Sequence, residues 1–483
     1  MLLLMSYNRM NSDAIRLEQA FDLNIEKVLE HWTLPFAIRE IIANALDEQA
    51  LTGTSDPAIF KDGYGYWRIA DSGRGIRYEH LTQNENAEKR RHPQVIGQFG
   101  MGLKDALAVF DRRGATVEIR SAHSDITTGR RPKEGFPDVV TLHALISRPS
   151  DPSRRGTDIV LTGVTDEDVE TAKGFFLRYS GERLLESTEY GDVLARRSPH
   201  APARVYVKGL FVAEEPNFMF SYNITKLSAA LRRALNRERS NVGRSAYSDR
   251  VKAILTACTS TDVAGPLAGG LNAYATGRLY DELAWRDVTL HACRVLQTNE
   301  KVVFATPWQM ASGSAQLQYA QDDGYRIVPV PEDIARSISG LTDLNGKPLV
   351  DLDGFRNKWN ASFSFVFVDP HVMTPGERAV FGRTEEIGAL VGADLRRRQV
   401  DVLISETMRL NETGNPVLGL WERAERRIVI RRDQLNAFAS YAGTLLHEIG
   451  HMTSGATDGT LNFESELSRL LGVTAAVALK ERS

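Results

Sequence analysis

Residues 39–48 read REIIANALDE, and this stretch decides how the N-terminal part of the chain is interpreted. It lies in an expected helix from Leu34 to Gln49. Glu40, Asn44 and Asp47 recur there at i, i+4 and i+7, so their side chains leave one face. A carboxylate one turn from an amide suits hydrated Mg²⁺, which prefers oxygen ligands and keeps several waters. Taken alone, however, the pattern favours an ordinary surface helix with polar residues outward.

Two motifs beside expected strands follow this helix. Asp71, Gly73 and Gly75 form a turn directly after an expected strand, Tyr66–Ala70. The glycines permit a tight turn and close backbone approach, and Asp71 can accept a hydrogen bond from an exocyclic amine. Thr157 opens a later expected strand. Each motif alone is ordinary turn chemistry.

A glycine-rich segment lies between these motifs. Three glycines come first, Gly97, Gly100 and Gly102, and Lys104 follows at the start of an expected helix. Backbone N–H groups, a helix N-terminus and one cation together make a cradle for phosphate. The segment is not a Walker A loop, because the spacing differs and no Ser or Thr follows the lysine. The long polar stretch that begins at Arg77 is typical of a lid or binding loop.

In this order and spacing, the four segments resemble the GHKL ATPases, the family of the gyrase B subunit, MutL, MORC proteins, the ninety-kilodalton heat-shock chaperone and sensor histidine kinases. The resemblance covers about residues 30–165 and implies a Bergerat α/β sandwich that binds ATP and Mg²⁺. It implies a general base at Glu40, a Mg²⁺ ligand at Asn44, an adenine reader at Asp71 supported by Asp47 and Thr157, the turn glycines Gly73 and Gly75, and a phosphate lid at Gly97, Gly100, Gly102 and Lys104. A general base favours the members that hydrolyse ATP over the histidine kinases.

The next region, about residues 166–295, looks like the transducer domain that follows the ATPase domain in gyrase, MutL and the chaperone. There, a cation on a loop reaches the γ-phosphate, and the candidates here are Arg237, Arg239 and Arg244. A solvated basic loop is an equally good interpretation, because arginine clusters serve both phosphate binding and solubility.

Residues 442–452 read AGTLLHEIGHM and contain a second constellation, His-Glu-x-x-His. His447 and His451 are one helical turn apart, so both imidazoles leave the same face and can share one Zn²⁺. Glu448 lies beside them and can take a proton from a metal-bound water. Two unrelated surface histidines are the alternative interpretation, which the surrounding sequence disfavours.

That surrounding sequence resembles short gluzincin peptidases of the ImmA-like type over about residues 360–475. An expected hairpin, Val417–Trp421 with Arg427–Arg431, stands directly before the helix, as does the substrate-binding edge strand of zincins. The resemblance implies a third zinc ligand from a glutamate on the next helix. The candidates, in order of preference, are Glu464, Glu466 and Asp458. Asp458 misses the metzincin spacing by one residue.

The composition fits an ordinary globular protein. The chain has 483 residues, of which 42% are hydrophobic and 25% charged, and this length suggests about three domains. The net charge of −3 argues against nucleic acid as a general partner. The two cysteines, Cys258 and Cys293, predict neither a disulfide framework nor a thiolate metal site. We find no signal peptide and no membrane-spanning stretch, and therefore expect a cytoplasmic protein.

We predict an α+β protein of four regions. They are an ATP-binding domain at 1–165, a transducer-like domain at 166–295, a small connecting α/β region at 296–360 and a zinc peptidase domain at 361–483. Further strands are expected at Thr116–Ser121, Val139–Ala144, Ala203–Leu210, Lys301–Ala305 and Tyr325–Val330.

The leading functional hypothesis is a peptidase that cleaves a protein substrate under the control of ATP, with Mg²⁺ and Zn²⁺ as cofactors. The alternative is an ATP-driven clamp of the MORC or chaperone type that remodels a protein or DNA partner and uses the zincin fold as a binding module. Related ATPases dimerise when ATP closes their lid. In an ATP-dependent homodimer of this chain, Met1–Leu29 would be the exchanged arm.

Overall fold

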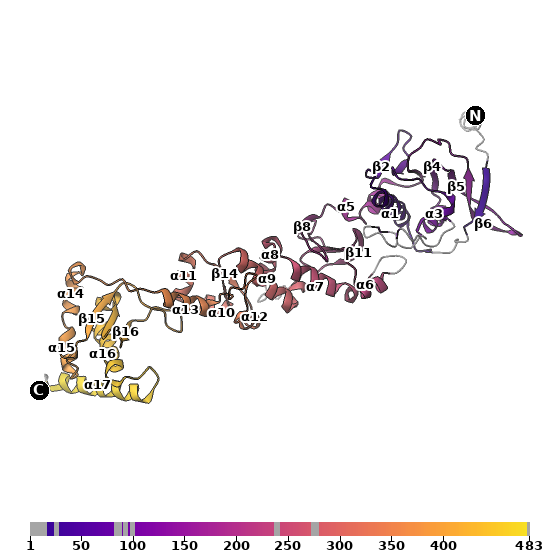
Figure 1. The fold of residues 1–483 in the computed structure, drawn as a ribbon. Coiled ribbons are helices and arrows are strands. Elements are labelled where there is room, and N and C mark those ends of the chain that lie inside the picture. Colours follow the sequence, from indigo (N-terminus) through magenta and orange to yellow (C-terminus); the bar gives the residue numbers. More distant parts are fainter. Residues whose placement is uncertain are drawn as a thin grey trace, which may run out of the picture. The chain divides into compact units, whose positions relative to one another are not determined.

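The computed structural model describes residues 17–23, 29–81, 89, 95–96, 102–235, 242–271 and 280–480 (Figure 1). The predicted α+β class is confirmed, since helices and several sheets alternate along the chain. Contacts group the chain into two units, Met1–Val263 with Tyr280–Val288 and Ala264–Leu279 with Thr289–Ser483. In the part of the chain that is described, no helix is both long and apolar enough to span a membrane.

The first unit begins with a seven-stranded antiparallel sheet in the order β1-β6-β5-β4-β7-β3-β2. Its strands are β1 (Leu17–Asp22), β2 (Ala58–Lys61), β3 (Trp67–Ala70), β4 (Thr116–Ser121), β5 (Asp125–Lys133), β6 (Phe136–Ser147) and β7 (Thr157–Thr162). Helices α1 (Leu34–Thr52), α3 (Gly102–Arg112) and α4 (Asp166–Lys173) pack with it. Buried and more exposed residues alternate along β4, because one face of the sheet packs on the helices.

The core of this domain lies between α1, α3 and the sheet. Ile38, Ile41 and Ile42 of α1 are fully buried against sheet residues such as Ile69 and Ile159. Burying each such side chain contributes about 1.5–3 kcal/mol. This packing fixes the rotation of α1 and thereby places its polar residues at one edge of the core.

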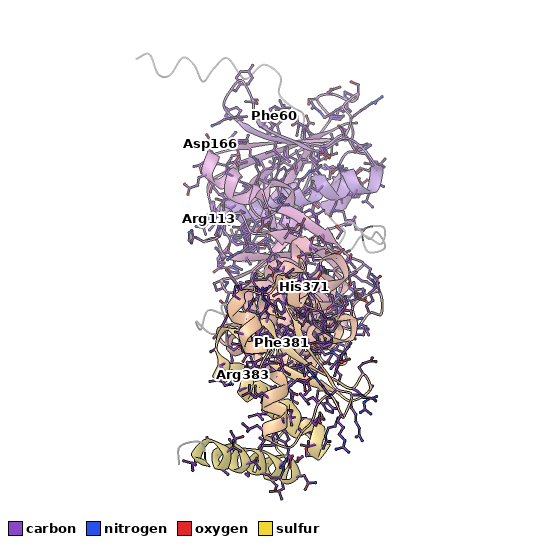
Figure 2. All side chains as sticks on the ribbon, turned by 90° about the vertical axis from the view of Figure 1, so that its left-hand side faces the viewer. Phe60, Arg113, Asp166, His371, Phe381 and Arg383 are labelled. Carbon is purple, nitrogen blue, oxygen red and sulfur yellow. The ribbon has the colours of Figure 1, made fainter. Side chains whose placement is uncertain are left out.

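The start of α4 is tied to the sheet by polar contacts. Asp166, labelled in Figure 2, accepts hydrogen bonds from Lys61 Nζ at 2.6 Å and from Trp67 Nε1 at 3.0 Å. The N-cap Thr165 also forms a reciprocal capping box with Asp168. These contacts connect the end of the first domain to the hairpin β2–β3.

A five-stranded sheet follows in the order β11-β10-β12-β9-β8, in which β10 and β12 are parallel. Its strands are β8 (Arg183–Ser187), β9 (Gly191–Ala195), β10 (Ala203–Val207), β11 (Leu210–Glu215) and β12 (Ser221–Ile224). The helices here are α5 (Leu177–Ser180), α6 (Ala229–Ala234), α7 (Ser248–Ala257) and α8 (Thr261–Leu271). The buried carboxylate of Glu282 accepts hydrogen bonds from the backbone N–H of Met219 and the hydroxyl of Tyr222. These hydrogen bonds attach the segment Tyr280–Val288, which also belongs to the first unit, to β12 and the residues before it.

The second unit contains two small sheets. The parallel pair β13 (Val302–Ala305) and β14 (Arg326–Pro329) lies among α9 (Arg286–Asn299), α10 (Pro307–Ala311), α11 (Ala315–Asp322), α12 (Glu332–Ile338) and α13 (Leu352–Ser362). The other sheet has the order β15-β17-β16, with β15 (Asp401–Ser405), β16 (Gly419–Glu422) and β17 (Arg427–Arg431). Its helices are α14 (Pro375–Phe381), α15 (Thr384–Leu390), α16 (Phe438–Ser454) and α17 (Leu461–Lys480).

Several predictions about elements can be compared directly with this fold. The predicted hairpin is confirmed as β16–β17, in which β16 is an edge strand. Within Met1–Leu29, the predicted exchanged arm, Leu17–Asp22 form β1, which pairs with β6. Strands β2, β5, β8, β9, β11 and β12 were not predicted. Each of the four predicted regions contains one of the described sheets, although contacts divide the chain into only two units.

Candidate metal centre and nucleotide site

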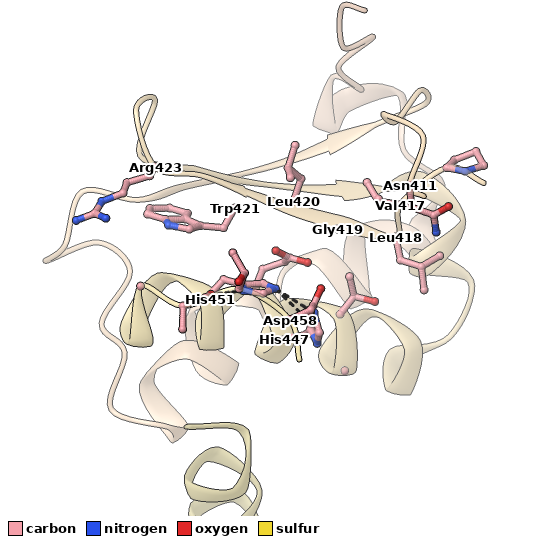
Figure 3. Close-up of a pocket in the computed structure, with 17 residues that line it drawn as sticks. Asn411, Val417, Leu418, Gly419, Leu420, Trp421, Arg423, His447, His451 and Asp458 are labelled. Carbon is pink, nitrogen blue, oxygen red and sulfur yellow. Dashed lines mark hydrogen bonds and ion pairs between the residues drawn. The ribbon is translucent and has the colours of Figure 1, made fainter. Parts of the chain in front are cut away.

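The His-Glu-x-x-His motif lies on α16, as the sequence predicts (Figure 3). The helix ends at Gly455, whose left-handed φ of 66° turns the chain while its N–H bonds to the carbonyl of His451. This turn returns the following loop toward the helix face that carries His447 and His451. The loop thereby brings Asp458 to the two imidazoles.

These three side chains form a compact cluster. Asp458 Oδ1 lies 3.2 Å from His447 Nε2 and 3.4 Å from His451 Nε2, and the two Nε2 atoms are 3.2 Å apart. His451 Nδ1 lies 2.8 Å from the carbonyl oxygen of Ala456, which fixes the tautomer that leaves Nε2 free for a metal ion. Burial lowers the pKa of His447 and so favours the neutral, ligating form. Two imidazoles and one carboxylate suit Zn²⁺ and leave a fourth position for water.

The structure brings Asp458, and not the preferred candidate Glu464, to the two imidazoles. Glu464 is exposed on α17 and lies outside the cluster formed by the histidines and Asp458. Its predecessor Phe463 faces the imidazoles, and successive helical side chains diverge by about 100°. Glu466, the second candidate, bonds to Thr453 and Arg469. Asp458, the last of the three candidates, is the one that lies within 3.4 Å of both imidazoles.

Glu448 lies between α16 and the edge strand β16. It is 5% exposed, and this burial, with the charge of Asp458, raises the pKa of its carboxyl group to about 7, although a hydrogen bond from the Trp421 backbone opposes the rise. A base with a pKa near the working pH is well matched to proton transfer. A Cβ atom at Gly419 would lie 2.7 Å from Glu448 Oε1, so a glycine permits this close approach.

A cavity of about 750 Å³ runs between β16 and α16 (Figure 3). Its lining includes His447, Glu448, His451 and Asp458 on one side, and Val417, Leu418, Gly419, Leu420, Trp421 and Arg423 on the other. Among the described strands β16 pairs only with β17, so its other edge has no strand partner. An edge strand above a metal-binding helix can bind an extended peptide as an added strand.

The N-terminal candidate site is built on α1. Arg39 is almost fully buried, and its Nε and Nη2 atoms donate to Glu40 Oε1 at 3.0 and 2.7 Å. Its guanidinium lies 5.1–5.6 Å from the ring centroids of Trp32, Phe36 and Phe175. These contacts hold the carboxylate of Glu40 in one orientation, whereas an exposed carboxylate would be free to rotate. The sequence analysis did not identify Arg39, because arginine on a helix usually lies at the surface.

Glu40 also lies against the N-terminus of α3. A Cβ atom at Gly102 would lie 2.2 Å from Glu40 Oε2, so only glycine leaves room for this carboxylate. A helix N-terminus favours a negative charge. The structure therefore brings Glu40 and Gly102 together, and Lys104 follows two residues later in the first turn of α3.

The other polar residues of α1 share a cation. Lys89 Nζ lies 3.1 Å from both Asn44 Oδ1 and Asp47 Oδ2. The backbone N–H of Ile96 donates to Asp47 Oδ1 at 2.6 Å. The amide of Asn44 and the carboxylate of Asp47 thus converge on the ammonium group of Lys89.

Asp71 and Thr157 meet where β3 ends and β7 begins. Asp71 Oδ1 accepts from the N–H of Gly73 at 2.8 Å and of Thr157 at 3.3 Å. Burial raises the pKa of Asp71, and these hydrogen bonds oppose that rise. Gly75 and Gly156 both have left-handed φ values, of 80° and 74°, and a Cβ atom at Gly156 would lie 2.0 Å from the Asp71 carbonyl oxygen.

Gly73 lies against the side chain of Glu48 on α1. A Cβ atom there would lie 2.2 Å from Glu48 Cγ. Glu48 Oε1 in turn accepts from both the N–H and the Nε of Arg74 at 2.8 Å. Burial opposes ionisation of Glu48, but Arg74 outweighs it and lowers the pKa of this carboxyl group. The glycine therefore makes room for a structural ion pair between α1 and the turn.

Some predicted phosphate-binding residues, Gly97, Gly100, Arg237 and Arg239, lie outside the described residues. Arg244 is described and pairs with Asp281 and Glu215, so it is engaged within its own domain. The sequence analysis missed Lys208, which occupies a turn between β10 and β11 with φ of 50°. Burial lowers the pKa of Lys208, while the charge of Asp47 raises it. The sequence signal that could have identified this turn is the Lys-Gly pair between two strands.

Comparisons with known proteins add a family relationship. Residues 167–261 match the family described as Mycoplasma pneumoniae MPN635 N-terminal domain. A Mycoplasma pneumoniae protein described as uncharacterized is 37% identical over 238 residues, which cover 48% of this chain and 95% of that protein. A second uncharacterized protein of the same organism is 24% identical over 345 residues, which cover 65% of this chain and 94% of that protein.

Proposed function

We propose that this chain, which belongs to the family of the Mycoplasma pneumoniae protein to which it is 37% identical, is a zinc-dependent peptidase controlled by ATP. One observation carries the proposal. His447, His451 and Asp458 converge on one point beside the buried carboxyl of Glu448, in a cavity bordered by an edge strand. This donor set fits a catalytic Zn²⁺ with one open position.

The residues around the cavity have separate tasks in this proposal. Zn²⁺ held by His447, His451 and Asp458 would acidify a bound water. Glu448 takes a proton from the attacking water as its oxygen bonds to the peptide carbonyl carbon. It then passes the proton to the leaving nitrogen as the C–N bond breaks, which yields a carboxylate and an amine. Outer backbone groups of β16 hold the substrate extended across the cavity.

The nucleotide part of the proposal rests on α1 and the turns around it. Glu40, held by Arg39 against the N-terminus of α3, would orient the water that attacks the γ-phosphate. Asn44 lies one turn further along α1, where a hydrated Mg²⁺ would bind, and Asp47 lies in the turn after it. Asp71 and Thr157 would contact the adenine. ATP hydrolysis would then change the conformation of the transducer-like domain, about residues 166–295, which contains Lys208.

The test combines metal content with cleavage of an unfolded protein. The parent should contain one zinc per chain and cut the substrate, whereas Glu448→Gln should retain zinc and lose cleavage, because it keeps the size of the side chain but not the base. Glu464→Gln is the matched control and should resemble the parent. Zinc and ATP hydrolysis without any cleavage would instead favour the clamp hypothesis, with the peptidase fold as a binding module. Absence of zinc from the parent would overturn the proposal.

A further inference from the structure

We propose that Phe463 is the positioning residue of the metal centre, whose ring holds the imidazoles of His447 and His451 in the orientation that lets one metal ion bind both. The inference rests on the proposed zinc peptidase function. It concerns how the site is organised before the metal binds, and it assigns this task to α17, which contributes no ligand of its own.

One aromatic ring contacts both histidines. The Phe463 ring stacks on the imidazole of His451, with centroids 4.1 Å apart and an interplanar angle of 11°. It meets His447 edge to face, at 4.9 Å and 76°. The two imidazoles are themselves at 80° to each other. The phenyl ring therefore sets the relative orientation of the two imidazole planes.

The position of Phe463 is itself fixed by packing between α16 and α17. Phe463 is 2% exposed. A Cβ atom at Gly450 would lie 3.2 Å from Phe463 Cε2 and 3.3 Å from Leu467 Cδ2, so the glycine lets α17 approach closely. Interiors packed at this density restrict side chains to one rotamer. Phe463 thus acts as a rigid support.

Two different restraints act on His451. The stacked phenyl ring fixes the plane of the imidazole, and the contact between Nδ1 and the Ala456 carbonyl fixes its rotation within that plane. Together they direct Nε2 toward Asp458 and His447. Groups that orient metal ligands in this way typically change metal affinity by about 10–100-fold when removed.

The experiment compares three variants of the full chain. Phe463→Leu removes the ring but keeps an apolar side chain, whereas Phe463→Tyr keeps the ring. Leu470→Ala removes a buried side chain from the same contact between α16 and α17 without touching the imidazoles, and it is the control for lost packing. Zinc affinity is measured by competition with a chromogenic chelator, and the visible spectrum of the Co²⁺ form reports the ligand geometry.

We expect Phe463→Leu to weaken zinc binding by about 10–100-fold and to alter the Co²⁺ spectrum. Phe463→Tyr and Leu470→Ala should retain the parent spectrum. Equal affinities in the parent and Phe463→Leu, or equal losses in Phe463→Leu and Leu470→Ala, would overturn the inference and leave the proposed function standing. Failure of the parent to bind zinc or Co²⁺ would overturn both.

Discussion

Asp458 and Glu464 differ in what surrounds each carboxylate, and this difference predicts which one binds the metal. Asp458 contacts both imidazoles, whereas Glu464 is exposed on the next helix. We expect Asp458→Asn to reduce bound zinc well below one per chain and Glu464→Gln to leave it at the parent level. Elemental analysis after dialysis against a weak chelator measures both. The opposite order would restore Glu464 as the third ligand.

Glu40 and Asp71 should affect ATP in separable ways. Glu40→Ala removes the proposed general base, so we expect nucleotide binding to persist and hydrolysis to slow by about 10²-fold or more. Asp71→Asn changes the carboxylate that bonds with Gly73 and Thr157 at the end of β3, so binding itself should be lost. Equilibrium binding of a fluorescent ATP analogue and phosphate release distinguish the two effects. Hydrolysis at the parent rate in Glu40→Ala would contradict the assignment of the base.

At the scale of elements, the spacing between β16 and α16 controls the geometry of the proposed peptidase site. Gly419→Ala would place a Cβ atom 2.7 Å from both Glu448 Oε1 and Thr444 Cγ2. The strand or the Glu448 side chain must then move, and we expect cleavage to fall by about 10-fold or more while zinc stays bound, as a small misplacement commonly causes.

Gly443→Ala is the matched control for that change. It lies on α16 and lines the same cavity, but a Cβ atom there meets nothing within 4 Å. Cleavage rates and zinc content should therefore resemble those of the parent. Equal losses of cleavage in the two glycine variants would show that the close approach of β16 to Glu448 is unimportant.

Elements that depend on local sequence were predictable, and those that depend on distant contacts were not. The helix α16 and the hairpin β16–β17 follow from periodicity and from the His-Glu-x-x-His spacing, and both are confirmed. Strand β1 escaped prediction because its pairing with β6 joins segments more than a hundred residues apart.

The same distinction applies to the candidate sites. Glu40, His447, Glu448 and His451 carry local motif signals. Asp458 reaches the imidazoles only because Gly455 turns the chain and Phe463 packs on α16, and no spacing rule expresses either event. The local sequence likewise gives no signal that Arg39 is buried.

At the scale of the whole molecule, residues of α11 and α13 hold one border of the cavity beside α16. We call residues 409–417 the rim loop, of which Asn411, Pro416 and Val417 line the cavity. Asn360 of α13 bonds to both backbone groups of Leu410, at 2.8 and 2.9 Å. The backbone N–H of Gln316 on α11 also donates to the Gly414 carbonyl at 2.9 Å. A displacement of α11 or α13 would therefore move the border of the cavity.

The last prediction follows from that arrangement. If ATP controls the peptidase, cleavage rates in ATP and in ADP should differ, and the rim loop is the element that would transmit the difference. Two hydrogen bonds contribute about 1–3 kcal/mol together, enough to shift a two-state equilibrium about tenfold. We expect Asn360→Ala to reduce the ratio of the two rates by about threefold or more, with zinc content and ATP binding unchanged.

Asn357→Ala, an exposed change on the same helix, is the control and should keep the parent ratio. The assay is cleavage of one unfolded substrate by each variant and by Glu40→Ala, which holds the ATP state. If Asn360→Ala keeps the parent ratio, the effect of the nucleotide is not transmitted through the rim loop. Equal rates in ATP and ADP for the parent would mean that the two sites work independently. A nucleotide that binds two states equally well does not shift the equilibrium between them.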